Sequence, residues 1–187
     1  AGVAAAVVVA ETQTFLYASR AVSPWKAHIF RVKNANPLAT LPSYWIPEVL
    51  AVLNGPFPQL VAGSNVLATS LENIGAVFHP ALTILNAGWI EATRGDFEYY
   101  LQGITPAVAK VLERVDAERL RVASALGVRT ISAREWLYVS YGSSGADLCE
   151  AIRATDGYRG INAPPTIAHR YIWEDVPMSL VPIASIG

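Results

Sequence analysis

Alternation of apolar and polar side chains marks the first third of the chain and predicts β-structure there. Residues 7–10 form a short β-branched run of the kind that fills a strand buried on both faces. Residues 15–19 and 27–33 flank a turn at Ser23 and Pro24, and polar and apolar residues alternate in the second of these segments. The pattern predicts a β-hairpin with one face in contact with solvent.

A proline-rich connection follows the hairpin and interrupts any regular periodicity. Prolines occur at positions 37, 42, 47, 56 and 58, and the one helical candidate in this region spans residues 46–53. Beyond it the period of the apolar residues changes, and we place a domain boundary near Ala62. We therefore predict one domain at residues 1–62 and a second at residues 63–187.

Apolar residues recur every three or four positions after this boundary, which predicts helices. One such stripe indicates a single long helix. Its members are Leu67, Leu71, Ile74, Phe78, Leu82, Leu85 and Trp89.

Three further helices are predicted, two of them from the residues at their ends. Thr105, followed directly by a proline, supplies an N-cap, and Gly127 ends that helix. Ser132 and Glu135 have the spacing of a capping box, and another helix is expected at residues 147–155. The sequence thus predicts a mainly α fold with strands near its N-terminus.

The charge balance is close to neutral and narrows the possible functions. The 187 residues include 14 Lys and Arg against 15 Asp and Glu, and 52% are hydrophobic. This composition indicates a core-forming chain and excludes a disordered region. It also excludes a basic nucleic-acid-binding protein, because no excess of positive charge is available to contact phosphates. Cys149 is the sole cysteine, which excludes a disulfide framework and a multi-cysteine metal site.

The mean hydropathy of +0.32 is high for a globular chain. The longest apolar run, residues 1–10, is shorter than the ~18 residues of a spanning helix, and no basic stretch precedes it as in a secretory signal. We therefore expect a cytoplasmic protein without membrane contacts, whose apolar surface is covered by a partner subunit, as in a homodimer, or by a further domain. The absence of an initial methionine leads us to expect a fragment or a trimmed chain.

The common nucleotide- and metal-binding motifs are absent from the sequence. Neither G-x-G-x-x-G after a strand nor G-x-x-x-x-G-K-[ST] occurs. Residues 142–145 read Gly-Ser-Ser-Gly, which differs from the nucleophile elbow of hydrolases and indicates a loop. The histidines at positions 28, 79 and 169 lack the i, i+4 spacing of a helical zinc site, so no metal site is expected.

His79 lies beside the apolar stripe of the predicted long helix, on a face of different character. The residues about one turn apart on this face are small or polar: Glu72, Gly75, Ala76, Thr83 and Asn86. Small residues allow a ligand to approach the helix. The alternative interpretation is a helix packed on both sides, with a hydrogen-bonded histidine in the core.

A second polar segment, residues 170–177, combines a guanidinium with two carboxylates in a chain that has few charges. Arg170 is suited to binding a substrate carboxylate through two hydrogen bonds. A carboxylate of this segment bonded to an imidazole nitrogen would fix the tautomer and suit the histidine to proton transfer. The alternative is a surface loop with a solvated pair between Arg170 and Glu174.

Several ordered strings in the sequence resemble the helical domain of opine dehydrogenases. They are Asn-Ile-Gly-Ala-Val-Phe-His-Pro at 73–80, Tyr-Tyr-Leu-Gln-Gly-Ile-Thr-Pro at 99–106, Val-Asp-Ala-Glu-Arg at 115–119, Tyr-Arg-Gly-Ile at 158–161 and the segment at 170–176. Residues 10–12 resemble the last part of the nucleotide-binding domain of the same family. Together these matches span nearly the whole chain.

The resemblance implies an enzyme that uses NAD(P)H to join an amino acid to a 2-oxo acid by reductive condensation. It also implies a Rossmann domain and an all-helical substrate domain, with the reaction in the cleft between them. Residues 1–62 would be the C-terminal strands of an incomplete Rossmann-type α/β domain whose glycine-rich half is missing. Residues 63–187 would be the helical substrate domain, incomplete at its C-terminus.

The resemblance further implies roles for four residues. His79 and Asp175 stand at the positions of the family's catalytic histidine and aspartate, and Arg170 stands where the oxo-acid carboxylate binds. Glu11 matches an acidic position near the amino-acid substrate. Asn73 lies in the same string as His79 but points about 120° away from it on a straight helix, so we assign it no role.

Two other functions are consistent with the sequence. The first is a non-catalytic helical module for binding or oligomerisation, which the excess apolar surface and the missing cofactor-binding half favour. The second is an imine-reducing enzyme on the same scaffold with other substrates, in which Trp89 and Trp136 line the pocket.

Overall fold

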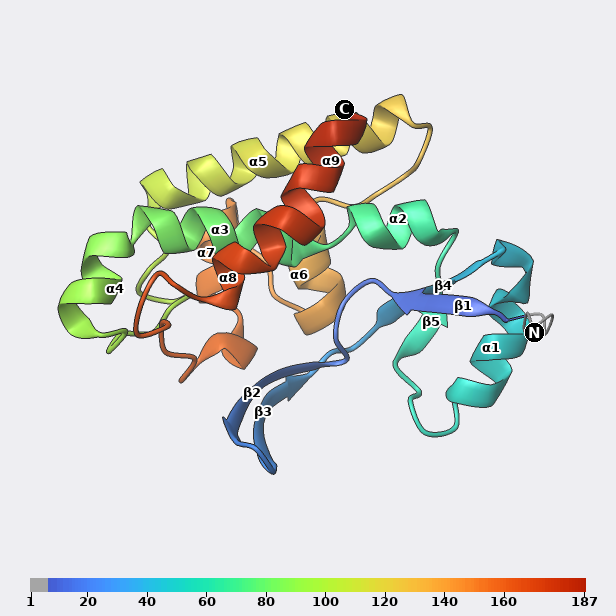
Figure 1. Ribbon diagram of the computed structural model, residues 1–187, viewed down its shortest axis with the longest axis horizontal. Coiled ribbons are helices and arrows are strands. Elements are labelled where there is room, and N and C mark those ends of the chain that lie inside the picture. The colour runs from blue at the N-terminus through green and yellow to red at the C-terminus, as the bar shows by residue number, and fades with distance from the viewer. Residues whose placement is uncertain (1–6) are drawn as a thin grey trace, which may run out of the picture.

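The computed structural model describes residues 7–187 of the chain. Figure 1 shows a helical body on one side and a small sheet with a neighbouring helix on the other. A two-stranded hairpin extends beside the helical body. The prediction of a mainly helical chain with strands at its N-terminal end is confirmed.

The sheet has the strand order β1–β4–β5. β1 (Val9–Thr12) is antiparallel to β4 (Asn36–Leu41), and β5 (Leu60–Ala62) is parallel to β4. The central strand is the most buried of the three, because strands pair with both of its edges and helices pack against it. Helix α1 (Ile46–Leu53), which the sequence predicted, follows the short 3₁₀ helix η1 (Ser43–Trp45) and packs against β4 and β5.

Strands β4 and β5 lie in the proline-rich connection, where the sequence indicated only a helix. Pro37 lies inside β4 and has no N–H to donate, but its carbonyl accepts the N–H of Gln13 at 2.8 Å. Pairing with segments distant in the sequence therefore creates a strand that local proline signals conceal.

The prediction that residues 7–10 are buried on both faces is wrong. Val7 is 71% exposed and Val9 is 57% exposed. β1 pairs along one edge only, and a single neighbouring strand does not bury both of its faces. The earlier part of the same apolar run, residues 1–6, lies outside the described residues.

β2 (Tyr17–Ser23) and β3 (Lys26–Val32) form the predicted hairpin. Both of its faces are largely exposed, so the expectation of a single solvent-facing side is wrong. Trp25 at the tip is 87% exposed and Ile29 is 53% exposed, whereas Phe30 is partly buried against the helical core. The hairpin therefore leaves most of its apolar side chains in solvent.

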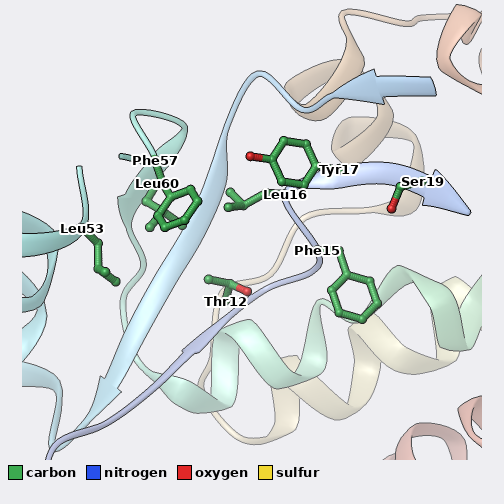
Figure 2. Close-up of a pocket in the computed structure, with 8 residues that line it drawn as sticks. All are labelled: Thr12, Phe15, Leu16, Tyr17, Ser19, Leu53, Phe57 and Leu60. Carbon is green, nitrogen blue, oxygen red and sulfur yellow. The ribbon is translucent and has the colours of Figure 1, made fainter. Parts of the chain in front are cut away.

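A groove of about 410 Å³ lies between the start of the hairpin and the sheet (Figure 2). Most of its walls are apolar, and it is lined by Thr12, Phe15, Leu16, Tyr17, Ser19, Leu53, Phe57 and Leu60. None of the candidate site residues named above contributes to this groove.

The prediction of one long helix after the boundary is wrong, because the apolar stripe runs over three helices. These are α2 (Val66–Leu71), α3 (Ile74–Leu85) and α4 (Ala87–Thr93). Asn73 caps the start of α3 with its side chain, and Asn86 is both the end of α3 and the start of α4. Asparagine side chains that bond to the backbone compete with helical hydrogen bonds, which explains the two interruptions.

The three further helices predicted from the sequence begin where it indicated. Thr105, Ser132 and Asp147 each accept a backbone N–H of the first turn, and Ser132 completes the capping box with Glu135. The elements after α4 are α5 (Pro106–Ala125), α6 (Ala133–Tyr141), α7 (Leu148–Arg153), η2 (Asp156–Tyr158), α8 (Arg170–Trp173), the π-helix η3 (Val176–Leu180) and α9 (Val181–Ile186). Helix α3 contacts α5, α8 and η3 (Figure 1). Within residues 7–187, no helix combines the length and apolar character needed to cross a membrane.

A buried ion pair joins the helices around the core. Arg119 is 2% exposed, and its guanidinium donates to the Asp116 carboxylate at 2.6 Å and to the carbonyls of Leu71 at 2.8 Å and Ile131 at 2.6 Å. Asp116 in turn accepts the N–H of Ala133 at 2.8 Å. The pair thereby connects α5 to the end of α2 and to the start of α6.

Candidate active site

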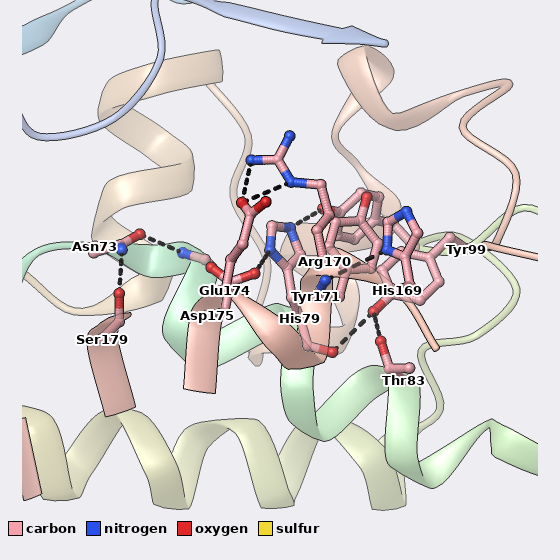
Figure 3. A network of polar contacts seen from close by, with 12 residues as sticks. Asn73, His79, Thr83, Tyr99, His169, Arg170, Tyr171, Glu174, Asp175 and Ser179 are labelled. Atoms are coloured by element: carbon pink, nitrogen blue, oxygen red, sulfur yellow. Dashed lines mark hydrogen bonds and ion pairs between the residues drawn. The ribbon is translucent and has the colours of Figure 1, made fainter. Parts of the chain in front are cut away.

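His79 and Asp175 are in direct contact, although they are 96 residues apart in the sequence (Figure 3). Nδ1 of the His79 ring lies 2.9 Å from Oδ2 of Asp175. The two side chains are 22% and 17% exposed, so the pair is largely but not fully shielded from solvent. α3 supplies the histidine, and the aspartate stands between α8 and η3.

Two tyrosines hold the other sides of the imidazole. Nε2 of His79 lies 2.8 Å from the hydroxyl of Tyr100, and the Tyr171 ring stacks on the imidazole with centroids 4.0 Å apart and an angle of 18°. Both ring nitrogens therefore have protein partners in this conformation.

Burial keeps the neighbouring phenols in their neutral form. It raises the pKa of Tyr99, Tyr100 and Tyr158 well above the ordinary value of a phenol. A neutral Tyr100 can donate its hydroxyl proton to Nε2, which leaves the imidazole proton on Nδ1 to be donated to Asp175. The chain of phenol, imidazole and carboxylate is thus suited to holding and moving a proton.

Asn73 belongs to the surroundings of this pair, which the assumption of a straight helix concealed. Because α3 begins at Ile74, Asn73 is its N-cap and its side chain accepts the N–H of Gly75 at 3.2 Å. Its Nδ2 donates to the hydroxyl of Ser179 in η3 at 2.6 Å. Asn73 therefore attaches the segment that carries Asp175 to the start of α3.

Arg170 lies on the same short segment as Asp175 but has a carboxylate partner of its own. Its Nε and Nη2 lie 3.0 and 2.8 Å from Oε2 of Glu174. The two side chains are 55% and 56% exposed. This is the surface pair that the sequence left open as an alternative.

Glu11 lies apart from the His79–Asp175 pair. Its Oε1 accepts hydrogen bonds from the hydroxyls of Thr69 and Ser70, the latter at 2.8 Å. These contacts join β1 to α2. Among the described residues, the structure brings His79 and Asp175 together but does not bring Glu11 into contact with either of them.

Sequence reasoning missed three residues around His79. Tyr100 and Tyr171 lie within two of the strings that carry the family resemblance, and that position was the available signal. Arg20 of the hairpin donates to the Tyr171 hydroxyl at 3.3 Å and to the Asn162 carbonyl at 2.7 Å. No local pattern marks Arg20, because its partners follow more than 140 positions later.

Metal binding has no support among the residues that the structure describes. No group of three or more His, Cys, Asp or Glu side chains within residues 7–187 is arranged to hold a metal ion. The side chains around His79 are suited to proton transfer, and the guanidinium of Arg170 is suited to binding a carboxylate.

Comparison with known proteins identifies relatives over almost the whole chain. The family described as NAD/NADP octopine/nopaline dehydrogenase, alpha-helical domain, matches residues 62–187. An opine dehydrogenase of Arthrobacter sp. (strain 1C) is 40% identical, over 97% of this chain and 50% of the relative. A vitopine synthase of Allorhizobium ampelinum is 25% identical, over 94% of this chain and 48% of the relative.

Solved structures agree with the sequence comparison at the level of the fold. An octopine dehydrogenase in complex with NADH and agmatine matches with a TM-score of 0.76 at 20% identity, over 96% of this chain and 51% of that chain. An octopine dehydrogenase with NADH and L-arginine matches with a TM-score of 0.71 at 21% identity, over 97% and 51%. The chain spans about half the length of these relatives.

Proposed function

Because the chain belongs to the NAD/NADP octopine/nopaline dehydrogenase family, we propose that it forms the substrate-binding and proton-transferring part of an NAD(P)-dependent opine dehydrogenase. The reaction is the reductive condensation of an amino acid with a 2-oxo acid. Residues 63–187 are the helical substrate domain in this proposal, and residues 1–62 are the trailing strands of the nucleotide-binding domain.

The nucleotide is not held through a phosphate loop of this chain. The 187 residues contain neither of the glycine-rich motifs that cradle phosphates. The hydride that reduces the C=N bond would come from a nicotinamide bound by residues outside this chain. The residues described here would bind and orient the substrates and move protons.

The contact of 2.9 Å between His79 and Asp175 is the observation that carries the proposal. In the reaction, the amine attacks the carbonyl carbon of the oxo acid, and water leaves the resulting carbinolamine to give a C=N bond. His79 would carry two protons from the amine nitrogen to the carbonyl oxygen, one as the carbinolamine forms and one as its hydroxyl leaves as water, while Asp175 orients the ring. Since Tyr100 bonds to Nε2, this bond must open, or the proton must pass through the hydroxyl.

Arg170 would bind the carboxylate of the oxo acid. For this role its guanidinium has to exchange Glu174 for the substrate. Exposed ion pairs of this kind contribute only about 0–1 kcal/mol, so a substrate carboxylate in a closed cleft can replace the Glu174 contact. Glu11 would lie near the amino-acid substrate. The hydroxyls of Thr69 and Ser70 both donate to its Oε1, which leaves Oε2 to accept a hydrogen bond from a cationic amine.

Replacement of His79 by alanine in the full-length protein tests the proposal. We expect kcat to fall about 10²- to 10⁴-fold, with nearly unchanged affinity for NAD(P)H, because a general acid–base group is removed. The same replacement of His28, which is exposed on the hairpin, provides the control. Turnover that is unchanged in the H79A protein would refute the role of His79.

The exposed apolar side chains of the hairpin and of the neighbouring groove favour a second candidate, a binding or oligomerisation module without catalysis. A homodimer would be one form of it. Titration of the chain with a 2-oxo acid and with NADPH, together with analytical ultracentrifugation, distinguishes the candidates. Self-association without binding of either ligand supports the module, whereas binding of the 2-oxo acid that depends on Arg170 supports the enzyme.

A further inference from the structure

Gly75 lies at the point where the groups of the His79–Asp175 pair converge. A Cβ atom added to Gly75 would lie 2.9 Å from Oδ1 of Asp175, 3.1 Å from Oδ1 of Asn73 and 3.3 Å from Nδ1 of His79. Ordinary van der Waals contact begins near 3.4 Å. A residue with a side chain at this position would therefore have to displace the pair itself.

The backbone conformation does not explain the glycine. Gly75 is the second residue of α3 and has the helical conformation that any residue adopts, unlike Gly95 and Gly142, whose φ angles are +78° and +73°. A Cβ at Gly103 or Gly145 would meet backbone atoms at 2.3 and 2.5 Å, which obstructs folding. At Gly75 the obstructed atoms are the ends of side chains, so the chain can fold and the cost falls on the geometry of the pair.

Asp175 has little freedom to retreat while its segment stays in place. Ser179, one turn further along η3, accepts the 2.6 Å hydrogen bond from Asn73. A displaced carboxylate must therefore rotate away from the imidazole, or the bond between Asn73 and Ser179 must lengthen. In either case the hydrogen bond of 2.9 Å between Nδ1 of His79 and Oδ2 of Asp175 is broken or loses its linear geometry. Hydrogen bonds weaken steeply as their angle departs from linear.

We propose that Gly75 is a positioning residue, whose missing Cβ leaves the space in which the Asp175 carboxylate meets Nδ1 of His79. This inference rests on the proposed function, because it assigns a catalytic consequence to the geometry of the pair. Gly75 acts through His79 and Asp175 and itself touches no reacting atom.

Gly88 offers a matched control for a Gly75→Ala variant. It is also the second residue of a helix, α4, and an asparagine also stands two positions before it at the N-cap. A Cβ at Gly88 would meet nothing within 4 Å. Both substitutions replace glycine by a better helix former, so we expect G88A to melt at or above the temperature of the unsubstituted protein. We expect G75A to melt close to that temperature, because the gain in helix propensity offsets the weakened contacts of the pair.

The two variants should differ in turnover. We expect kcat of the full-length G75A protein to fall roughly ten- to hundredfold, because small misplacements of catalytic groups have effects of this size. The KM values for the amino acid and the oxo acid should change little, and G88A should keep kcat within about twofold. A G75A protein that keeps its kcat, or that melts far below the unsubstituted protein, would overturn the inference.

Nuclear magnetic resonance of the His79 ring separates this inference from the proposed function. The Nδ1 proton bonded to Asp175 should give a downfield signal in the unsubstituted protein and in G88A, and this signal should weaken or vanish in G75A. If H79A is inactive but the signal persists in G75A, the inference fails and the proposed function stands. If H79A is fully active, the proposed catalytic role fails, and the signal still reports whether Gly75 seats the pair.

Discussion

The N-terminal segment and the helical body place similar side chains in opposite surroundings. Around His79, Tyr99 is fully buried and Tyr100 is 6% exposed, whereas in the hairpin Trp25 is 87% exposed and Phe15, just before it, is 73% exposed. The helical body achieves burial because α3, α8 and the 99–103 loop converge on one point. Two strands alone provide no such convergence.

This difference shows where a polar network can be maintained. Asp175, His79 and Tyr100 act on each other through short hydrogen bonds because packed aromatic rings exclude most of the water around them. The hairpin contributes to the site through one long side chain, that of Arg20. Four predictions test how far the two regions differ, beginning with the largest expected effect.

Replacement of Asp116 by alanine should destabilise the helical body by about 3–5 kcal/mol, because it leaves the Arg119 guanidinium buried without its carboxylate. Urea denaturation followed by circular dichroism measures the change. Glu118 provides the control on the same helix, because its ion pairs with Arg114 and Arg121 are exposed. E118A should cost less than about 1 kcal/mol, and equal losses for the two variants would contradict the contrast.

Lys33 joins the two regions and should make stability depend on pH. Its Nζ donates to the Thr14 hydroxyl at 3.1 Å and to the Phe15 carbonyl, and lies 5.6 Å from the centre of a Trp136 ring. Burial lowers the pKa of Lys33 from 10.5 to about 8. The unfolded chain therefore holds this proton more tightly, and the contribution of Lys33 to stability rises with pH from about 8 to 10.5.

The size of this effect is up to about 3 kcal/mol. The free energy of unfolding of the unsubstituted protein, measured between pH 8 and 10.5, should rise relative to that of a K33M variant. The comparison with K33M removes the shared contribution of tyrosine ionisation. Parallel pH curves for the two proteins would show that Lys33 is solvated rather than buried.

Replacement of Tyr100 by phenylalanine should lower kcat of the full-length protein about tenfold, the equivalent of one hydrogen bond. The reason is that the imidazole loses one of its two hydrogen-bonded anchors while its stacking on Tyr171 remains. Tyr138, which is 64% exposed on α6, supplies the control, and Y138F should leave kcat unchanged. Steady-state assays of NAD(P)H consumption distinguish the outcomes, and equal kcat values in both variants would exclude a role for the Tyr100 hydroxyl.

The smallest effect is expected at the tip of the hairpin. Trp25→Ala should change the free energy of unfolding by less than about 0.5 kcal/mol, because the ring is already in solvent. Trp136→Ala, at a ring that is 5% exposed, should cost about 3–5 kcal/mol. If thermal denaturation gives similar losses for both, the hairpin tip is covered in solution and the contrast between the regions disappears.

Local signals predicted the parts of the fold that depend on neighbouring residues. Thr105, Ser132 and Asp147 marked helix starts correctly, because each cap bonds within its own first turn. The break at Asn73 escaped prediction, since an apolar stripe continues across the gap between α2 and α3. Strand β4 escaped it too, because a strand that contains Pro37 becomes visible only with its partners.

The candidate site shows the same division. The family resemblance singled out His79 and Asp175, and the structure has them in contact, but their roles remain predictions. Spacing alone could not bring residues 96 positions apart together. The bond of the Tyr100 hydroxyl to the imidazole and the bond of the Arg20 guanidinium to Tyr171 arise from tertiary packing, so residue spacing did not assign either residue to the site.

Arg20 gives the hairpin a mechanical connection to the imidazole. Its guanidinium donates hydrogen bonds to the Asn162 carbonyl and the Tyr171 hydroxyl, and the ring of Tyr171 stacks on the imidazole of His79. While these hydrogen bonds are intact, a movement of the hairpin relative to the helical body displaces the Tyr171 ring that covers His79. A molecule bound to the exposed strands would therefore act on the surroundings of the imidazole through Arg20.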